Sequence, residues 1–166
     1  FKEATKLMRT SQLSKVASRS DDYEGFQQPW GLAYGDLGSV QFAEVTVNTE
    51  TGFVKVDKIV AAHSCGRPLN MGQLESQING GVIQGVSYAL YENRVMDKGT
   101  GHMMNANVDQ YKTPYSMEIP EIENLIIEEY SARSSTDAYG IGEPANIATA
   151  AAIANAVYNA IGVRIY

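Results

Sequence analysis

Hydrophobic and polar residues alternate most clearly in the second quarter of the chain. The run from Phe42 to Val47 is rich in β-prone residues, and the run from Phe53 to Val60 alternates apolar with polar side chains. The five residues between them, Asn48 to Gly52, are typical of a turn and place a glycine at its end. This pattern predicts a β-hairpin. An extended segment over residues 61–69, ending in a Gly-Arg-Pro turn, is expected to follow it.

Helical spacing replaces the alternation in two later segments. Between Met71 and Tyr91 the apolar residues fall three and four positions apart, which predicts a helix. A second helix is predicted from about Asn146 to Ile161, with Gly162 as its C-terminal cap. Its apolar residues lie on nearly all faces, so we expect this helix to be buried. Those residues are Ile147, Ala150, Ala151, Ala154, Val157 and Ile161.

The remaining segments predict a modest sheet and its connections. A polar, glycine-containing stretch over 96–107 and a loop to Pro120 lead to a short strand over 124–130. A loop over 131–144 then precedes the terminal helix. The expected fold class is α+β, with a mixed sheet that contains the β-hairpin and packs against the two main helices.

We expect residues 1–166 to form a single domain, with an amphipathic helix over 1–20, a connection over 21–38 and a core over 39–166. Charge distinguishes the first segment, which carries five cations and one anion, from residues 114–145, which carry seven anions and one cation. The first segment is either a targeting peptide or a solvated amphipathic helix. It lacks an apolar core of signal-peptide length and a small-residue cleavage pattern, which favours the helix.

Composition narrows the function classes. The 166 residues are 44% hydrophobic and 19% charged, which is typical of a globular chain. The net charge of −6 argues against a general nucleic-acid-binding surface, which needs clustered Lys and Arg. No stretch approaches the roughly 20 apolar residues of a membrane helix. The single cysteine rules out an internal disulfide and any all-cysteine zinc or iron–sulfur site within these residues.

The first predicted helix contains three glycines, Gly80, Gly81 and Gly85, each of which costs roughly 1 kcal/mol relative to alanine inside a helix. Two explanations are open: another helix or strand packs closely against this glycine notch, or the backbone approaches a ligand there. Gln77 and Gln84 are seven residues apart and therefore lie on one face. Their amides would suit a flat cofactor rich in heteroatoms.

Glu143 precedes Pro144, which predicts an extended backbone for Glu143 and makes Pro144 a suitable first residue of the terminal helix. The positive end of the helix dipole would favour the ionised carboxylate, while burial would raise its pKa. A carboxylate under these opposing influences is suited to general base catalysis. The alternative is a plain N-terminal cap, for which Glu is a poorer choice than Ser, Thr, Asp or Asn.

Other reactive side chains are weaker candidates. Cys65 could act as a nucleophile with His63 beside it, but a lone cysteine at a strand end is more often a small core residue. His63 and His102 do not have the spacing of metal ligands. The sequence contains no Walker loop, dinucleotide fingerprint or serine nucleophile elbow.

Four short segments occur in a fixed order: Gln41–Val45, Ser64–Asn70, Gln77–Gly85, and Gly142–Pro144 before the Ala-rich helix. Together they resemble the C-terminal part of the molybdopterin-binding large subunit of the molybdenum hydroxylases. This family includes xanthine dehydrogenase, aldehyde oxidoreductase and isoquinoline 1-oxidoreductase, and the last branch is the most similar. Each segment alone is a weak signal, whereas four in the right order are specific.

The resemblance runs from about Gly31 to the end of the sequence, and the preceding helix is compatible with it. The sequence departs from the family pattern at two places. Ser64 stands where the family often has Asp before Cys-Gly, and Asn70-Met71 where it usually has Asn-Pro. These differences fall at a strand end and a turn, away from Glu143.

The resemblance implies a role for each candidate residue. Glu143 matches the glutamate that takes a proton from a molybdenum-bound hydroxide, so that this water-derived oxygen can attack an aldehyde or N-heteroaromatic carbon. Gln77 matches a glutamine that hydrogen-bonds near the dithiolene end of the pterin. Gly80 and the glycines after it fit a helix that approaches the cofactor. The implied cofactor is molybdenum-molybdopterin, either as such or in its cytosine dinucleotide form.

The resemblance also implies motifs that these 166 residues lack, namely the glycine-rich loops and an oxo-contacting glutamine of a complete large subunit. The iron–sulfur clusters of the family would need about eight cysteines, and this sequence has one. We therefore expect a domain fragment whose partners are the remainder of the large subunit, an iron–sulfur subunit or domain, and a small-molecule substrate. The isolated chain is expected to lack turnover and tightly bound molybdenum, and the expected location is the cytoplasm, with the periplasm as the alternative. A non-catalytic ligand-binding or subunit-association module, and one half of a split enzyme, are the competing interpretations.

Overall fold

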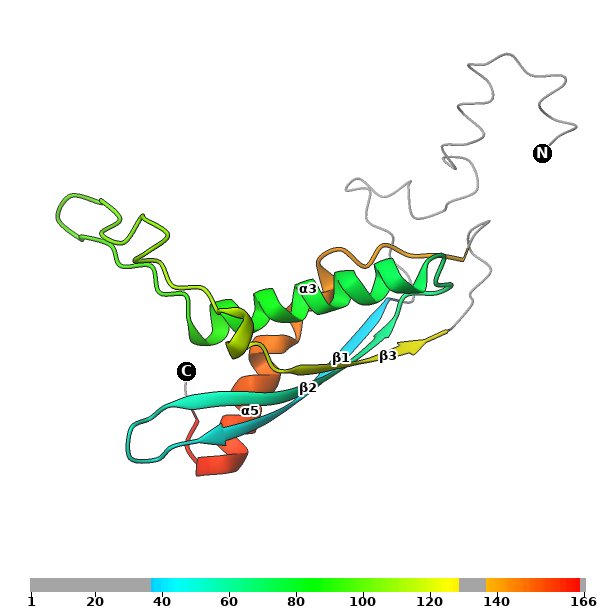
Figure 1. The fold of residues 1–166 in the computed structure, drawn as a ribbon, viewed down its shortest axis with the longest axis horizontal. Helices are drawn as coiled ribbons and strands as arrows, with labels where there is room; N and C mark the ends of the chain where they lie inside the picture. The colour runs from blue at the N-terminus through cyan, green and yellow to red at the C-terminus, as the bar shows by residue number, and fades with distance from the viewer. Residues whose placement is uncertain (1–36, 129–136, 165–166) are drawn as a thin grey trace, which may run out of the picture.

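The computed structural model describes residues 37–128 and 137–164, which form a mixed sheet covered by two long helices (Figure 1). Its elements in chain order are β1 (Gly38–Val47), β2 (Val54–Ser64), α3 (Met71–Leu90), the 3-10 turn η2 (Ser116–Glu118), β3 (Glu121–Ile127), α4 (Pro144–Ile147) and α5 (Thr149–Ile161). The α+β class, the hairpin and the first long helix are as the sequence predicts.

The sheet has the order β1-β2-β3, with β1 antiparallel and β3 parallel to β2. The hairpin turn is fixed by Asn48, whose side-chain oxygen accepts hydrogen bonds from the backbone N–H groups of Glu50 and Thr51, both at 3.0 Å. Gly52 closes the turn at φ +75°, a conformation that favours glycine. The predicted hairpin is therefore confirmed, together with the local chemistry of its turn.

The third strand begins and ends three residues before the predicted range of 124–130, because its bounds follow those of its neighbour. β3 pairs with β2 from Lys58–Glu121 to Ser64–Ile127, and β2 ends at Ser64. The ammonium group of Lys58 contacts the carboxylate of Glu121 at 3.1 Å, where this pairing starts. Single-sequence patterns locate such a strand but not the register that limits it.

Both long helices pack on the same face of the sheet. Gln41, Ala61 and Asn124 are neighbours in register across the three strands. The side chain of Asn124 bonds to Asn79 on α3, while that of Gln41 bonds to Thr149 on α5. The core between the layers consists of Val56, Ile59, Ala61, Cys65, Leu74, Ile78, Val82, Val86, Ile153 and Val157.

The terminal helix differs from the predicted one in its start, its continuity and its burial. It begins at Pro144 and is interrupted at Ala148, so that α4 and α5 are separate. Its buried residues recur every fourth position, namely Ala145, Thr149, Ile153 and Val157, whereas Ile147 is 69% exposed. The predicted all-round burial is wrong for the described residues, because the alanines give the helix an apolar composition while a single stripe meets the sheet and α3.

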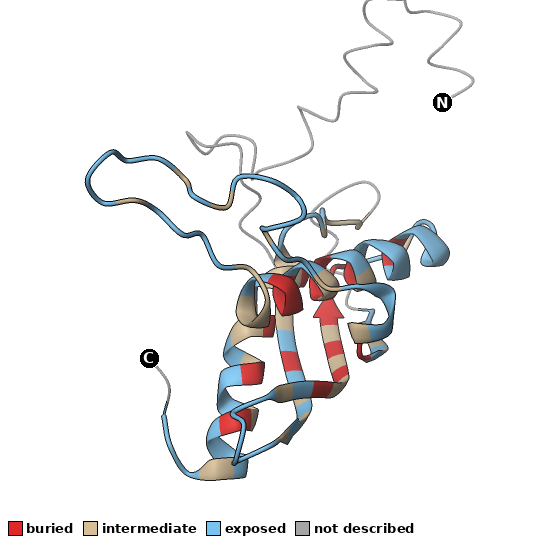
Figure 2. Ribbon diagram, turned by 60° about the vertical axis from the view of Figure 1, so that its left-hand side comes forward, coloured by how far each residue is buried: buried red, intermediate tan, exposed pale blue. Residues whose placement is uncertain are grey.

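Residues 92–115 form a long excursion between α3 and β3, mostly exposed and extending away from the helices and sheet (Figure 2). This confirms the predicted loop. The structure does not describe the predicted helix at 1–20, most of the connection over 21–38, or residues 129–136. Among the described helices none combines the length and the apolar character needed to cross a membrane.

The glycine notch of α3 has a packing explanation at two of its three positions. A Cβ added to Gly81 would lie 2.5 Å from the Cβ of Ala145, and one added to Gly85 would lie 2.6 Å from Oγ1 of Thr149. Both glycines therefore let α4 and α5 approach the backbone of α3. At Gly80 an added Cβ would meet nothing within 4 Å. The packing interpretation thus accounts for Gly81 and Gly85 and leaves Gly80 on an open surface.

We expect Gly85→Ala to lower the free energy of unfolding by about 1–3 kcal/mol, since the new methyl group must displace Thr149 from a fully packed site. Gly80→Ala is the matched control in the same helix, and its higher helix propensity should raise stability by up to about 1 kcal/mol. Thermal or urea unfolding of the two variants measures the contrast. Equal stabilities would contradict the assignment of Gly85 as a packing residue.

Candidate functional site

Glu143 lies exposed at the start of α4, with φ −86° and ψ −29°. The predicted extended backbone is wrong, because the carbonyl of Glu143 accepts a hydrogen bond from the N–H of Asn146 at 3.0 Å, which requires a helical turn here. The side chain of Glu143 makes no capping hydrogen bond. The expected balance of burial and helix dipole is also absent among the described residues, since the carboxylate is exposed and α4 has four residues.

Three polar side chains of α3 bind the turn that carries Glu143. Nε2 of Gln77 donates to the carbonyl of Gly142 at 2.9 Å, and the hydroxyl of Tyr88 donates to the carbonyl of Asn146 at 2.7 Å. Nδ2 of Asn146 donates to Oε1 of Gln84 at 2.9 Å. Gln77 and Gln84 therefore lie on one face, as their spacing predicts, and that face contacts the chain on both sides of Glu143.

The segment before Glu143 is anchored to the end of the sheet. Gly66 forms an isolated β-bridge with Ala138. The φ angle of Gly66 is +71°, and a side chain at this position would collide with the carbonyl of Asp137. The N–H of Arg67 donates to this carbonyl at 2.7 Å, and the N–H of Tyr139 donates to the carbonyl of Cys65 at 3.0 Å. The turn is thus held from the sheet end as well as from α3.

Gln77, Gly80 and Glu143 offer the groups that an organic cofactor would need. All three are exposed, and Gly80 leaves space beside the helix where a flat molecule can reach the backbone. The bond to Gly142 uses one N–H of Gln77, and an amide has a second donor and an acceptor oxygen. In the described ranges no three His, Cys, Asp or Glu side chains gather as a metal site. The arrangement therefore offers hydrogen-bonding groups to an organic molecule bound beside α3.

Cys65 and His63 belong to the core. Cys65 is 3% exposed, and burial raises the pKa of its thiol, which disfavours the nucleophilic thiolate. The interpretation of Cys65 as a small core residue is therefore the better one. His63 is completely buried on β2 opposite Ser39, and neither of its ring nitrogens has a hydrogen-bond partner within the part of the chain that the structure describes.

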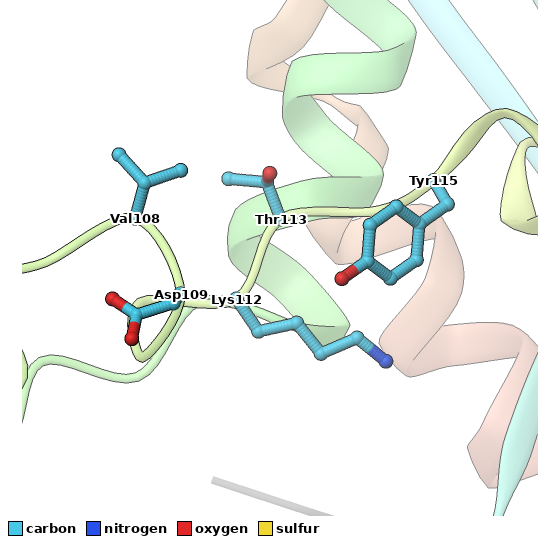
Figure 3. A pocket seen from close by; sticks show the side chains of 5 residues that line it. All are labelled: Val108, Asp109, Lys112, Thr113 and Tyr115. Atoms are coloured by element: carbon cyan, nitrogen blue, oxygen red, sulfur yellow. The ribbon is translucent and has the colours of Figure 1, made fainter.

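The structure also has an open hollow of about 660 Å³ on the excursion, lined by Val108, Asp109, Lys112, Thr113 and Tyr115 (Figure 3). Lys112 bonds to Glu118 at 3.0 Å and lies over the ring of Tyr91. None of the predicted site residues lines this hollow, so it is separate from the turn at Glu143.

Residues 4–120 match the sequence profile of the molybdopterin cofactor-binding domain. The chain belongs to this family. The matched residues of the molybdopterin cofactor-binding domain include Gln77 and Gly80 and end before Glu143. The family assignment thus agrees with the resemblance found in the sequence motifs, while the roles of the individual residues stay predictions.

Named relatives of this molybdopterin cofactor-binding domain are enzyme subunits. The chain is 37% identical over 125 residues to the aldehyde oxidoreductase molybdenum-binding subunit PaoC of Escherichia coli, covering 75% of this chain and 17% of that protein. It is 35% identical over 117 residues to the nicotine 6-hydroxylase large subunit of Paenarthrobacter nicotinovorans, covering 70% of this chain and 14% of that protein.

The fold is found again in the aldehyde oxidoreductase of Desulfovibrio gigas, with a TM-score of 0.70 and 30% identity, over 78% of this chain and 14% of that one. The chain therefore spans less than a fifth of the length of these relatives. The match in fold confirms the α+β assignment as part of a molybdopterin-binding domain.

We expect the protein to lose stability below about pH 6.5 because of His63. Burial lowers the pKa of its imidazole from the ordinary value of 6.5, so protons bind the unfolded chain first as the pH falls. His63→Leu should remove this loss, measured as the change in melting temperature between pH 7.5 and pH 5. The carboxyl groups of Asp57, Asp97 and Glu118 also have lowered pKa values, but their effect on stability falls below the range from pH 7.5 to pH 5.

His102→Gln is the matched control, since the His102 side chain is exposed and His63 remains in place. The melting temperature of His102→Gln should fall between pH 7.5 and pH 5 by as much as that of the parent protein. A His63→Leu variant that declines as steeply as the parent would contradict the prediction.

Proposed function

We propose that this chain supplies part of the active site of a molybdopterin-dependent hydroxylase, with Glu143 as its general base. The membership of the molybdopterin cofactor-binding domain family supports the cofactor class. The observation that carries the proposal is the 2.9 Å hydrogen bond from Gln77 to the carbonyl of Gly142. It joins the exposed, glycine-bearing surface of α3 to the turn of Glu143, so that one bound molecule can reach both.

Each residue has a separate task in this proposal. Gln77 and the open backbone at Gly80 bind one edge of the pterin, and Glu143 accepts a proton from the oxygen nucleophile derived from water. The bound cofactor supplies the metal that activates this oxygen and accepts the electrons of the oxidation. Because the Glu143 carboxylate is exposed and makes no capping bond, it is available as a proton acceptor.

The proposed substrate is an aldehyde or an N-heteroaromatic compound. Two relatives support this class, since one is named as an aldehyde oxidoreductase subunit and the other as a nicotine 6-hydroxylase subunit. The proposed partners are the remainder of the large subunit and an iron–sulfur subunit or domain, which would pass electrons onward. The cytosine dinucleotide form of the cofactor and a cytoplasmic location also stay predictions.

We expect Glu143→Gln to lower the kcat of the complete enzyme by about 10²–10⁴-fold, since the amide has the shape of the carboxylate but cannot accept the proton. Molybdenum content per subunit should stay that of the parent. Steady-state kinetics with an aldehyde or N-heteroaromatic substrate and metal analysis of the same preparation measure both quantities.

Glu75→Gln is the control, because Glu75 is an exposed carboxylate of α3 that takes no part in the proposed site. It should keep the kcat of the parent. Near-normal turnover of Glu143→Gln would show that another group accepts the proton and would remove the base assignment.

We also expect the 166-residue chain alone to bind no stoichiometric molybdenum and to show no turnover. It spans 17% of the aldehyde oxidoreductase subunit that it matches, and in our proposal the remainder of the large subunit completes the cofactor site. Expression in cells that make the cofactor, followed by metal analysis of the purified chain, provides the measurement. A molybdenum-to-protein ratio near one would contradict this prediction.

A further inference from the structure

Gln41 is a buried amide on the edge strand β1, 9% exposed, and both of its polar ends are engaged. Nε2 donates to the carbonyl of Ala145 at 2.7 Å, and Oε1 accepts from the hydroxyl of Thr149 at 2.7 Å. These bonds join residues more than 100 positions apart in the sequence. A glutamine at this position is therefore a link between the sheet and the junction of α4 and α5.

The link has one allowed orientation. A flipped amide would point its oxygen at the carbonyl of Ala145, which would place two acceptors against each other. The hydroxyl of Thr149 is fixed in turn, because Thr149 is completely buried and packs against Gly85 of α3. Gln41 thus ties α4 and α5 to β1 through two hydrogen bonds that are separate from those of α3.

Glu143 is two residues from the carbonyl that Gln41 binds. Pro144, which lies between them, has a φ angle fixed by its ring. The fixed φ angle removes one of the torsions that could absorb a shift of Ala145 before it reaches Glu143. Gln77 and Tyr88 hold the two ends of the same turn from α3, at Gly142 and Asn146. The turn is clamped between helix and strand, and Gln41 is the clamp on the strand side.

We propose that Gln41 is a positioning residue for Glu143: its two buried hydrogen bonds set the place of the carboxylate relative to the surface of Gln77 and Gly80. This inference rests on the proposed function for the role of Glu143. Its structural part, that Gln41 holds the turn, does not depend on the cofactor. A displacement of about 1 Å at a reacting group can cost on the order of 100-fold in rate, so a clamp of this kind matters for turnover.

The test compares Gln41→Leu with Asn124→Leu in the complete enzyme. Asn124 is the matched control, since it is also an amide on the helix-facing side of the sheet, but it bonds to Asn79 of α3 at 2.8 Å and not to the turn. We expect Gln41→Leu to lower kcat per bound molybdenum about 10- to 100-fold with KM within about twofold of the parent. Asn124→Leu should keep both values within about twofold.

Hydrogen exchange gives a readout that needs no turnover. Gln41→Leu should speed amide exchange in the peptide over 142–152 while leaving β2 and the first half of α3 protected, and Asn124→Leu should leave the 142–152 peptide unchanged. If Gln41→Leu does not fold, Thr149→Val and Thr149→Ser replace it. Valine keeps the shape of threonine and removes the donor to Gln41, so Thr149→Val should speed amide exchange over 142–152 to a smaller extent. Thr149→Ser keeps the hydroxyl and should have the exchange rates of the parent protein.

The outcomes separate this inference from the proposed function. If Gln41→Leu has the kcat and the amide exchange rates of the parent enzyme while Glu143→Gln is inactive, the positioning role alone is overturned. Faster exchange over 142–152 in an enzyme whose Glu143→Gln variant is fully active would overturn the base assignment while confirming the clamp on the turn. Equal loss of kcat in Gln41→Leu and Asn124→Leu would also overturn the inference, because it would show a general effect on the sheet.

Discussion

The close approach of α4 and α5 to the backbone of α3 is the contact on which the rest of the structure depends. It is possible because Gly81 and Gly85 have no side chain where Ala145 and Thr149 pack. The glycines cost helix propensity, and the tight packing of the second helix offsets that cost. At this spacing, polar side chains at the edges of the contact form hydrogen bonds between the two elements. They are Gln77, Gln84 and Tyr88 from α3, and Asn146 from α4.

This contact also explains why the chain can present a carboxylate without burying it. Glu143 is exposed, but the turn around it is bonded to α3 on both sides and to β1 through Gln41. Within the described residues the chain therefore fixes where the Glu143 backbone lies and leaves its carboxylate exposed. In our proposal the surroundings that tune this group come from the cofactor and the remaining domains of the enzyme.

The sequence predicts the elements whose signal is local. The hairpin is encoded by alternation and by Asn48 and Gly52, and α3 by its regular spacing. Asn70, which precedes the departure from the family pattern at Met71, caps α3 by accepting a hydrogen bond from the N–H of Gln73 at 3.1 Å. The bounds of β3 and the exposure of Ile147 depend on contacts between distant segments, which local patterns do not contain. The helical backbone of Glu143 comes from the turn that its carbonyl closes with the N–H of Asn146, against the extended preference of a residue before proline.

Gln41 illustrates the same limit within the candidate site. On a strand that alternates toward a core, a glutamine at an inward position breaks the pattern, and this is a signal that sequence reasoning can detect. Its partner cannot be read from the sequence, because the carbonyl of Ala145 comes into reach only after the glycine notch has set the height of α4. A leucine at position 41 would satisfy the alternation better and would leave that buried carbonyl without its donor. The polar residue at this position is therefore explained by the turn it holds, and the folding of the sheet alone gives no reason for it.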